Sequence, residues 1–183
     1  MSRDGYAPGA AAGAHVEKHG QRWTLALVRD LHHPPEKVWR ALTDPKELHE
    51  WAPFDADRNL GVTGQATLTT VGAPTTQVSE TYITRAEEPR LLEYSWGGND
   101  IRWELEPVGK GTRLKLWHSI DKRYVAMGAA GWHLCLDVLG RLLDGRPIGR
   151  IVGGAAMRFD WKRLNAEYSK QFGVDEKQPD SPT

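Results

Sequence analysis

Between residues 57 and 119, apolar and polar side chains alternate, and short turn sequences interrupt the alternation at intervals. Alternation with a period of two is typical of strands that bury one face. Five segments show it, at 64–71, 76–86, 91–96, 100–106 and 112–119, and a further short strand is predicted at 59–62. The turns contain Gly or Pro, and short connections join antiparallel neighbours. This part of the chain therefore predicts an antiparallel sheet.

Helical patterns lie on both sides of these strands. Residues 23–31 alternate and predict a first strand, and two short helices should follow it, because Pro35 suits the first turn of a helix. After Asp121, apolar residues recur every three or four positions as far as Leu143, which predicts a long amphipathic helix. A second such segment at 157–172 predicts a final helix.

The order of these elements predicts an α+β fold, in which a curved antiparallel sheet of about six or seven strands wraps around a long C-terminal helix. The apolar face of the sheet must be covered, and the long helix is the obvious cover. Residues 21–173 are expected to form this single domain. Residues 1–20 are rich in Gly and Ala and predict a disordered leader. Residues 174–183 are polar and predict a disordered tail.

Composition excludes some classes of protein. Lys plus Arg and Asp plus Glu both number 24, so the chain lacks the net positive charge of a typical nucleic-acid binder. No apolar run approaches the roughly 20 residues that span a bilayer, and an apolar signal core is missing from the N-terminus. Cys135 is the only cysteine, so no internal disulfide can form. These features predict a cytoplasmic protein.

Large aromatic side chains gather on the predicted inner face of the sheet. An aromatic wall with a few polar groups is typical of a small-molecule pocket. Aromatic residues also bury large areas in ordinary cores, so the pattern leaves both interpretations open. The predicted ligand-binding residues are those expected between sheet and helix: Trp39, Trp51, Tyr94, Trp96, Trp103, His118, Trp132 and His133.

Three residues are candidates for acid–base catalysis. His118 is expected on the buried face, where desolvation lowers the pKa of an imidazole. His133 and Asp137 are four residues apart on the long helix, so they can touch, and a carboxylate that orients an imidazole is half of a general-base pair. No nucleophile accompanies them, so the sequence leaves open whether the protein is an enzyme. Cys135 is expected to be a core residue.

No metal ion or cofactor is predicted. The sequence has no CxxC or HExxH motif and no Gly-rich phosphate loop. His15 and His19 are four residues apart, but the pattern indicates no helix there and no third ligand nearby.

Several segments resemble a known family. The sequence has PPEKVWRALTDP at 34–45, LEYSWG at 92–97, RWELEP at 102–107, GTRL at 111–114 and GWHLCLD at 131–137. With Trp51, these segments resemble the START-like (SRPBCC) superfamily, and within it the bacterial group named after the activator of the heat-shock protein 90 ATPase. The resemblance covers roughly residues 23–172. It implies a helix-grip fold that encloses a cavity between the sheet and the long helix.

Three hypotheses for function follow. The first is a protein that binds a small apolar, aromatic or lipid-like molecule in that cavity. The second is a cyclase, dehydratase or hydrolase that uses His118, or His133 with Asp137. The third is an interaction module, either a homodimer or a chaperone activator, with Trp117 as an exposed anchor. A chaperone interaction is not expected, because the eukaryotic activator has a separate chaperone-binding domain for which this chain has no room.

Overall fold

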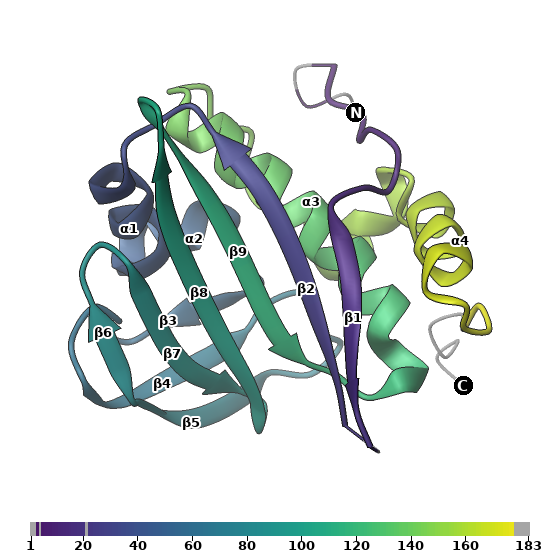
Figure 1. Cartoon of the computed structure of the whole chain (residues 1–183), viewed down its shortest axis with the longest axis horizontal. Helices are drawn as coiled ribbons and strands as arrows, with labels where there is room; N and C mark the ends of the chain where they lie inside the picture. Colours follow the sequence, from purple (N-terminus) through teal and green to yellow (C-terminus); the bar gives the residue numbers. More distant parts are fainter. Residues whose placement is uncertain (1–2, 4, 21, 178–183) are drawn as a thin grey trace.

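Two antiparallel sheets dominate the computed structural model, which describes residue 3, residues 5–20 and residues 22–177 (Figure 1). The larger sheet has the order β1 (Ala14–His19), β2 (Arg22–Leu31), β9 (Gly111–Ser119), β8 (Asn99–Val108), β7 (Leu91–Trp96) and β6 (Arg85–Glu87). The smaller sheet has the order β3 (Phe54–Ala56), β4 (Gly64–Thr70) and β5 (Gln77–Ile83).

Helices connect and cover these sheets. The α-helices are α1 (Pro35–Thr43), α2 (Pro45–Trp51), α3 (Val125–Leu143) and α4 (Trp161–Phe172), and two 3₁₀ helices are η1 (Lys122–Tyr124) and η2 (Gly153–Arg158). Between α1 and α2 the chain turns at Asp44, whose carboxylate accepts a hydrogen bond from the Lys46 N–H at 2.8 Å. Pro45 then occupies the first turn of α2, where its missing N–H has no cost.

The larger sheet curves around α3 (Figure 1). The inner side chains of its central strands, such as Leu27, Trp103 and Leu116, are buried together with most of α3. This arrangement confirms the predicted α+β fold, with the long C-terminal helix as the cover of the sheet. Because the strands pair in regular antiparallel register, alternate residues of β9 point to opposite faces.

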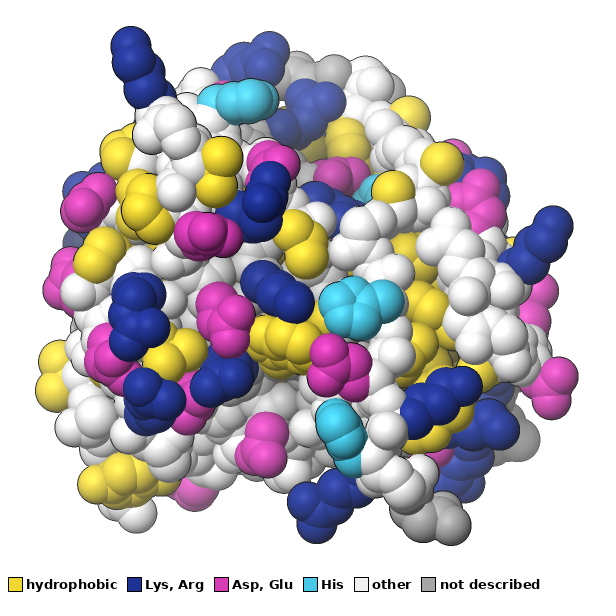
Figure 2. Space-filling view, viewed as in Figure 1, with side chains coloured by type: hydrophobic (Ala, Val, Ile, Leu, Met, Phe, Trp, Pro, Cys, Tyr) yellow, Lys and Arg dark blue, Asp and Glu magenta, His cyan; other side chains and the backbone are white. Residues whose placement is uncertain are grey.

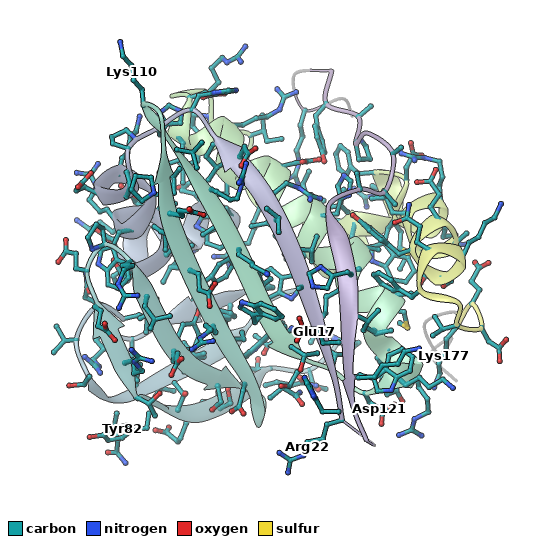
Figure 3. The ribbon with its side chains drawn as sticks, in the orientation of Figure 1. Glu17, Arg22, Tyr82, Lys110, Asp121 and Lys177 are labelled. Carbon is teal, nitrogen blue, oxygen red and sulfur yellow. The ribbon has the colours of Figure 1, made fainter. Side chains whose placement is uncertain are left out.

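The two ends of the larger sheet are marked in Figure 3. Lys110 lies at the turn between β8 and β9, whereas Arg22 and Asp121 lie at the opposite end. His118 is three residues before Asp121, and its register partners are Leu25 on β2 and Ile101 on β8. The imidazole therefore belongs to the end of the sheet where β2 begins and β9 ends.

The structure differs from the sequence-based expectation in the first 20 residues. Ala14–His19 form β1, which pairs antiparallel with β2 through six successive residue pairs, and Val16 packs against the core. The sequence predicts a disordered leader here and not a strand. Six residues with little alternation of apolar and polar side chains give only a weak indication of a strand. Pairing with β2 covers what would otherwise be an open sheet edge. Of the predicted disordered tail, residues 178–183 lie outside the described residues.

Other boundaries also differ. Residues 59–62 form a turn rather than a strand, because the Arg58 guanidinium donates to the carbonyl oxygens of Asn59, Val62 and Gln65 and holds the backbone bent. The predicted strand at 76–86 is divided into β5 and β6, which belong to different sheets. The final helix begins at Trp161 rather than near residue 157, since Asp160 has a left-handed backbone.

Candidate functional site

Indole and phenyl rings pack edge to face between the sheet and α3. Trp51 and Trp103 have ring centroids 5.9 Å apart, Trp103 and Trp132 are 5.6 Å apart, and Trp96 and Trp132 are 5.9 Å apart. Such geometry is favourable, because the positive edge of one ring meets the negative face of the next. The members of this aromatic cluster come from α2, β3, β7, β8, β9 and α3: Trp51, Phe54, Tyr94, Trp96, Trp103, His118 and Trp132.

The structure thus brings together six of the eight predicted ligand-binding residues. Trp39 is also buried, on α1, and its indole nitrogen lies beside Gly61. His133 lies in a separate cluster with Asp137 and Tyr168. Phe54 belongs to the aromatic cluster but was not among the predicted residues, since a lone phenylalanine after Pro53 carries no periodic signal.

Each indole N–H of the aromatic cluster has a hydrogen-bond acceptor. Trp51 donates to the Ala41 carbonyl at 2.9 Å, and Trp103 donates to the Tyr94 hydroxyl at 3.0 Å. Burial raises the pKa of Tyr94 well above its ordinary value, so this phenol stays protonated at neutral pH. Trp96 donates to the Thr70 hydroxyl. These bonds satisfy polar groups that would otherwise be costly inside a core.

His118 is the acceptor for the fourth indole. Trp132 Nε1 lies 2.9 Å from His118 Nδ1, and the Trp96 ring stacks on the imidazole at a centroid distance of 5.9 Å. The His118 residue is only 5% exposed, and burial lowers its pKa to about 4, so it is neutral at pH 7. Its other nitrogen, Nε2, is buried and has no hydrogen-bond partner among the described residues.

The small residues of α3 divide into two kinds. A Cβ on Gly128 would meet Ile120 Cδ1 at 2.5 Å, so Gly128 lets the helix pack closely. A Cβ on Gly131, one turn further along the helix, would have no heavy atom within 4 Å. Gly131 is partly exposed and therefore has open space around it, at the position before Trp132 on the helix.

His133 and Asp137 do meet on α3, as their spacing predicts, but in different surroundings. His133 Nε2 lies 3.5 Å from Asp137 Oδ2, and His133 Nδ1 lies 2.8 Å from the Tyr168 hydroxyl of α4. The guanidinium of Arg29 approaches the same Nδ1 at 3.4 Å. Because arginine only donates, Nδ1 accepts and Nε2 carries the proton that faces the carboxylate.

Residues 5–13, here called the N-terminal segment, cover this second cluster. The Tyr6 hydroxyl donates to Asp137 Oδ2 at 2.6 Å, and its ring packs against Phe159. The Ala11 N–H donates to the Glu167 carboxylate at 2.8 Å. The histidine–aspartate pair is therefore bonded to protein groups on both sides and holds the N-terminal segment on α3 and α4. No periodic pattern in the sequence marks Tyr6 for this contact.

The stability that this cluster contributes should depend on pH. Burial by itself raises the pKa of Asp137, but hydrogen bonds from His133 and Tyr6 and the charge of Arg29 outweigh burial and hold the pKa below its ordinary value. A carboxyl whose pKa is lower in the folded state than in the unfolded state stabilises the fold at pH values above the unfolded-state pKa, which is about 4. That contribution is lost as the pH falls through the folded-state pKa.

We therefore expect the difference in unfolding free energy between the wild type and Asp137→Asn to be largest above about pH 4 and to shrink below it. Thermal unfolding of both proteins between pH 2.5 and pH 7 measures this difference. A difference that stays constant across the range would contradict the assignment of the Asp137 carboxylate to this network.

The outer face of the larger sheet carries a different surface. Trp117 is half-buried there, with the Lys115 ammonium 4.0 Å from its ring centroid and the His15 ring at its edge. A groove of about 460 Å³ crosses this face and is lined by Tyr82, Arg102 and Trp117, among others. Figure 2 shows this face as a small hydrophobic area among charged side chains of both signs. Trp117 is thus packed beneath neighbouring side chains rather than projecting as an isolated anchor.

The part of the chain that the structure describes offers neither a metal site nor a membrane-spanning helix. Within residues 3, 5–20 and 22–177, no group of three or more His, Cys, Asp or Glu side chains could hold a metal ion. Over the same residues, no helix combines the length and apolar character that a membrane span requires.

Cys135 is buried, and burial raises its pKa to about 12, so the thiol is unreactive at neutral pH.

Comparison with known proteins agrees with the observed fold. The model of the family described as "Activator of Hsp90 ATPase homolog 1-like protein" matches residues 32–144, well over half of the chain. No curated protein is similar enough in sequence to be matched.

Solved structures with the same fold come from several bacteria. EF2215 from Enterococcus faecalis, described as a conserved protein of unknown function, has 19% identity and a TM-score of 0.66, and the match covers 86% of this chain and 89% of that protein. CalU16 from Micromonospora echinospora has 23% identity and a TM-score of 0.60, with 92% and 97% covered. MLL2253 from Mesorhizobium loti has 26% identity and a TM-score of 0.58, with 67% and 97% covered.

Proposed function

The chain belongs to the family of activator of Hsp90 ATPase homolog 1-like proteins, and from that premise we propose that it binds a small, largely apolar ligand between the curved sheet and α3. The observation that carries the proposal is the buried Nε2 of His118, which has no partner among the described residues although aromatic rings surround it. A buried donor without an acceptor costs about 1–3 kcal/mol, so a bound molecule that supplies the acceptor would stabilise the site.

The aromatic cluster suits such a ligand. Its rings provide a wide apolar contact surface, and its few polar groups orient a bound molecule. The rings already contact one another, so entry requires a side chain to move. Trp96 is the half-buried member, whereas Trp51, Trp103 and Trp132 are at most 3% exposed. We assign the entrance to Trp96, which is held by the Thr70 hydroxyl.

Binding is favoured over acid–base catalysis by the separation of the candidate residues. His118 lies in the aromatic cluster, whereas His133 and Asp137 are bonded to Tyr168, Arg29 and the N-terminal segment. The two imidazoles are thus in different surroundings, and no carboxylate of the described residues is bonded to both. A cytoplasmic location and a homodimer stay predictions.

Filling the open space at Gly131 should weaken binding. We expect Gly131→Leu to lower the affinity for the neutral fluorescent probe N-phenyl-1-naphthylamine by about tenfold or more, because the added side chain fills the open space at the position before Trp132. Replacing a helical glycine also favours the helix, so the variant should fold at least as well. Probe titration followed by fluorescence measures the affinity.

Gly140→Leu is the matched control. Gly140 lies on the same helix, and a Cβ there would also have no heavy atom within 4 Å, but it is more than two turns from Gly131. The control should bind the probe like the wild type. A wild type that does not bind the probe, or equal affinities in all three proteins, would contradict the proposed site.

A further inference from the structure

We propose that His118 makes the site selective for ligands that present a neutral oxygen acceptor, such as a ketone, over carboxylates and over pure hydrocarbons. This inference rests on the proposed function and adds the chemical class of the ligand. It depends on the hydrogen bonds of the His118 imidazole.

The hydrogen bond from Trp132 fixes the tautomer of His118. An indole N–H can only donate, so the Trp132 Nε1 at 2.9 Å requires a lone pair on His118 Nδ1. A neutral imidazole with an unprotonated Nδ1 carries its proton on Nε2. The group that lacks a partner is therefore an N–H donor, and it calls for an acceptor rather than for a second donor.

The surroundings of His118 favour an uncharged acceptor. A carboxylate would be bound best by an imidazolium, but the imidazolium has N–H groups at both nitrogens, and the one at Nδ1 would point at the indole N–H of Trp132. His118 cannot become charged without losing that bond. The ring neighbours of His118 are Trp96 and Trp132, neither of which supplies positive charge. A carboxylate would therefore be buried without compensation, which is costly.

A hydrocarbon ligand offers no acceptor to the Nε2 proton. A purely apolar ligand would fill the same space and leave the Nε2 proton without an acceptor. A ketone of equal shape would accept that proton and keep the aromatic contacts. The site should therefore distinguish two ligands that differ only in this one oxygen.

The test uses three naphthalenes of similar size: 2-acetylnaphthalene, 2-isopropylnaphthalene and 2-naphthoate. Each competes with N-phenyl-1-naphthylamine in the wild type, His118→Leu and His118→Gln. The affinity of the ketone relative to the isopropyl compound should fall about tenfold from the wild type to His118→Leu. Because this ratio is compared between proteins, the different hydration of the two ligands cancels.

His118→Gln should retain the ratio, since its amide can accept from Trp132 and still donate to the ketone. In the wild type, 2-naphthoate should bind at least about tenfold more weakly than the ketone. An unchanged ratio in His118→Leu, or naphthoate as the tightest ligand, would overturn the inference and leave the proposed function in place. If none of the three naphthalenes displaces the probe, the inference fails; if the probe itself does not bind to the wild type, the proposed function fails as well.

A second measurement uses the wild type alone, in case His118→Leu does not fold. Histidine-selective ¹⁵N NMR should show one protonated nitrogen on His118, at Nε2. The Nε2–H resonance should shift on addition of 2-acetylnaphthalene and stay in place with 2-isopropylnaphthalene. Equal shifts with both ligands, or a proton on Nδ1, would overturn the inference.

Discussion

Replacing Trp103 with alanine is expected to lower the free energy of unfolding by about 3–5 kcal/mol. The Trp103 side chain is 1% exposed and packs edge to face against both Trp51 and Trp132. Its removal leaves a cavity that neighbouring rings can fill only in part, and it deprives the Tyr94 hydroxyl of its indole donor. Urea unfolding followed by circular dichroism measures the loss.

Trp117→Ala is the matched control for that experiment. It makes the same chemical change on the neighbouring strand, at the outer face of the sheet. Trp117 is only half-buried there, so folding removes less of its apolar area from water. We expect a cost of about 1 kcal/mol. Similar costs for the two substitutions would mean that the aromatic cluster is not the main packed core.

Gly153→Ala is expected to lower the free energy of unfolding by about 2–4 kcal/mol. Gly153 has a left-handed backbone with φ of 57°, and a Cβ there would lie 2.7 Å from the carbonyl carbon of Gly72. This close approach joins the turn between β4 and β5 to the segment that precedes α4. A methyl group would strain the backbone and push the two segments apart.

Gly154→Ala is the control, because a Cβ at the next residue has no heavy atom within 4 Å and Gly154 does not have a left-handed backbone. We expect it to change the stability by less than about 0.5 kcal/mol. The two variants differ by one position in the chain, so thermal unfolding side by side isolates the contact with Gly72. Equal melting temperatures would contradict the close approach.

The Trp103 substitution and the probe titration both test the aromatic cluster, the first through its packing and the second through ligand binding. If the aromatic cluster is packed tightly enough for Trp103 to contribute several kcal/mol, then a ligand can enter only where a ring is able to move. Trp96 meets that requirement, because it is half-buried and its indole N–H is held by a hydrogen bond to the Thr70 hydroxyl. Strong stability of the cluster and ligand binding at His118 are therefore compatible.

Local pattern in the sequence determined most of the fold. Alternation along 91–96 predicts β7 with its exact bounds, and the three-to-four-residue spacing as far as Leu143 predicts α3, since both periods are properties of a single segment. The same alternation places Tyr94, Trp96 and Trp103 on one face. The spacing of His133 and Asp137 likewise predicts their contact.

Tertiary structure alone decided what surrounds each of these groups. Burial of Tyr6 against Asp137 depends on residues 131 positions apart, and the bond from Trp132 to His118 depends on how a helix is placed over a strand. No periodic pattern records such distances, because a period describes the direction of a side chain and not its neighbour. The sequence by itself therefore determined the sheet, the long helix and the aromatic inner face. The packing of distant segments decided that His133 and Asp137 belong to the cluster under the N-terminal segment, while His118 Nε2 is buried without a partner among the described residues.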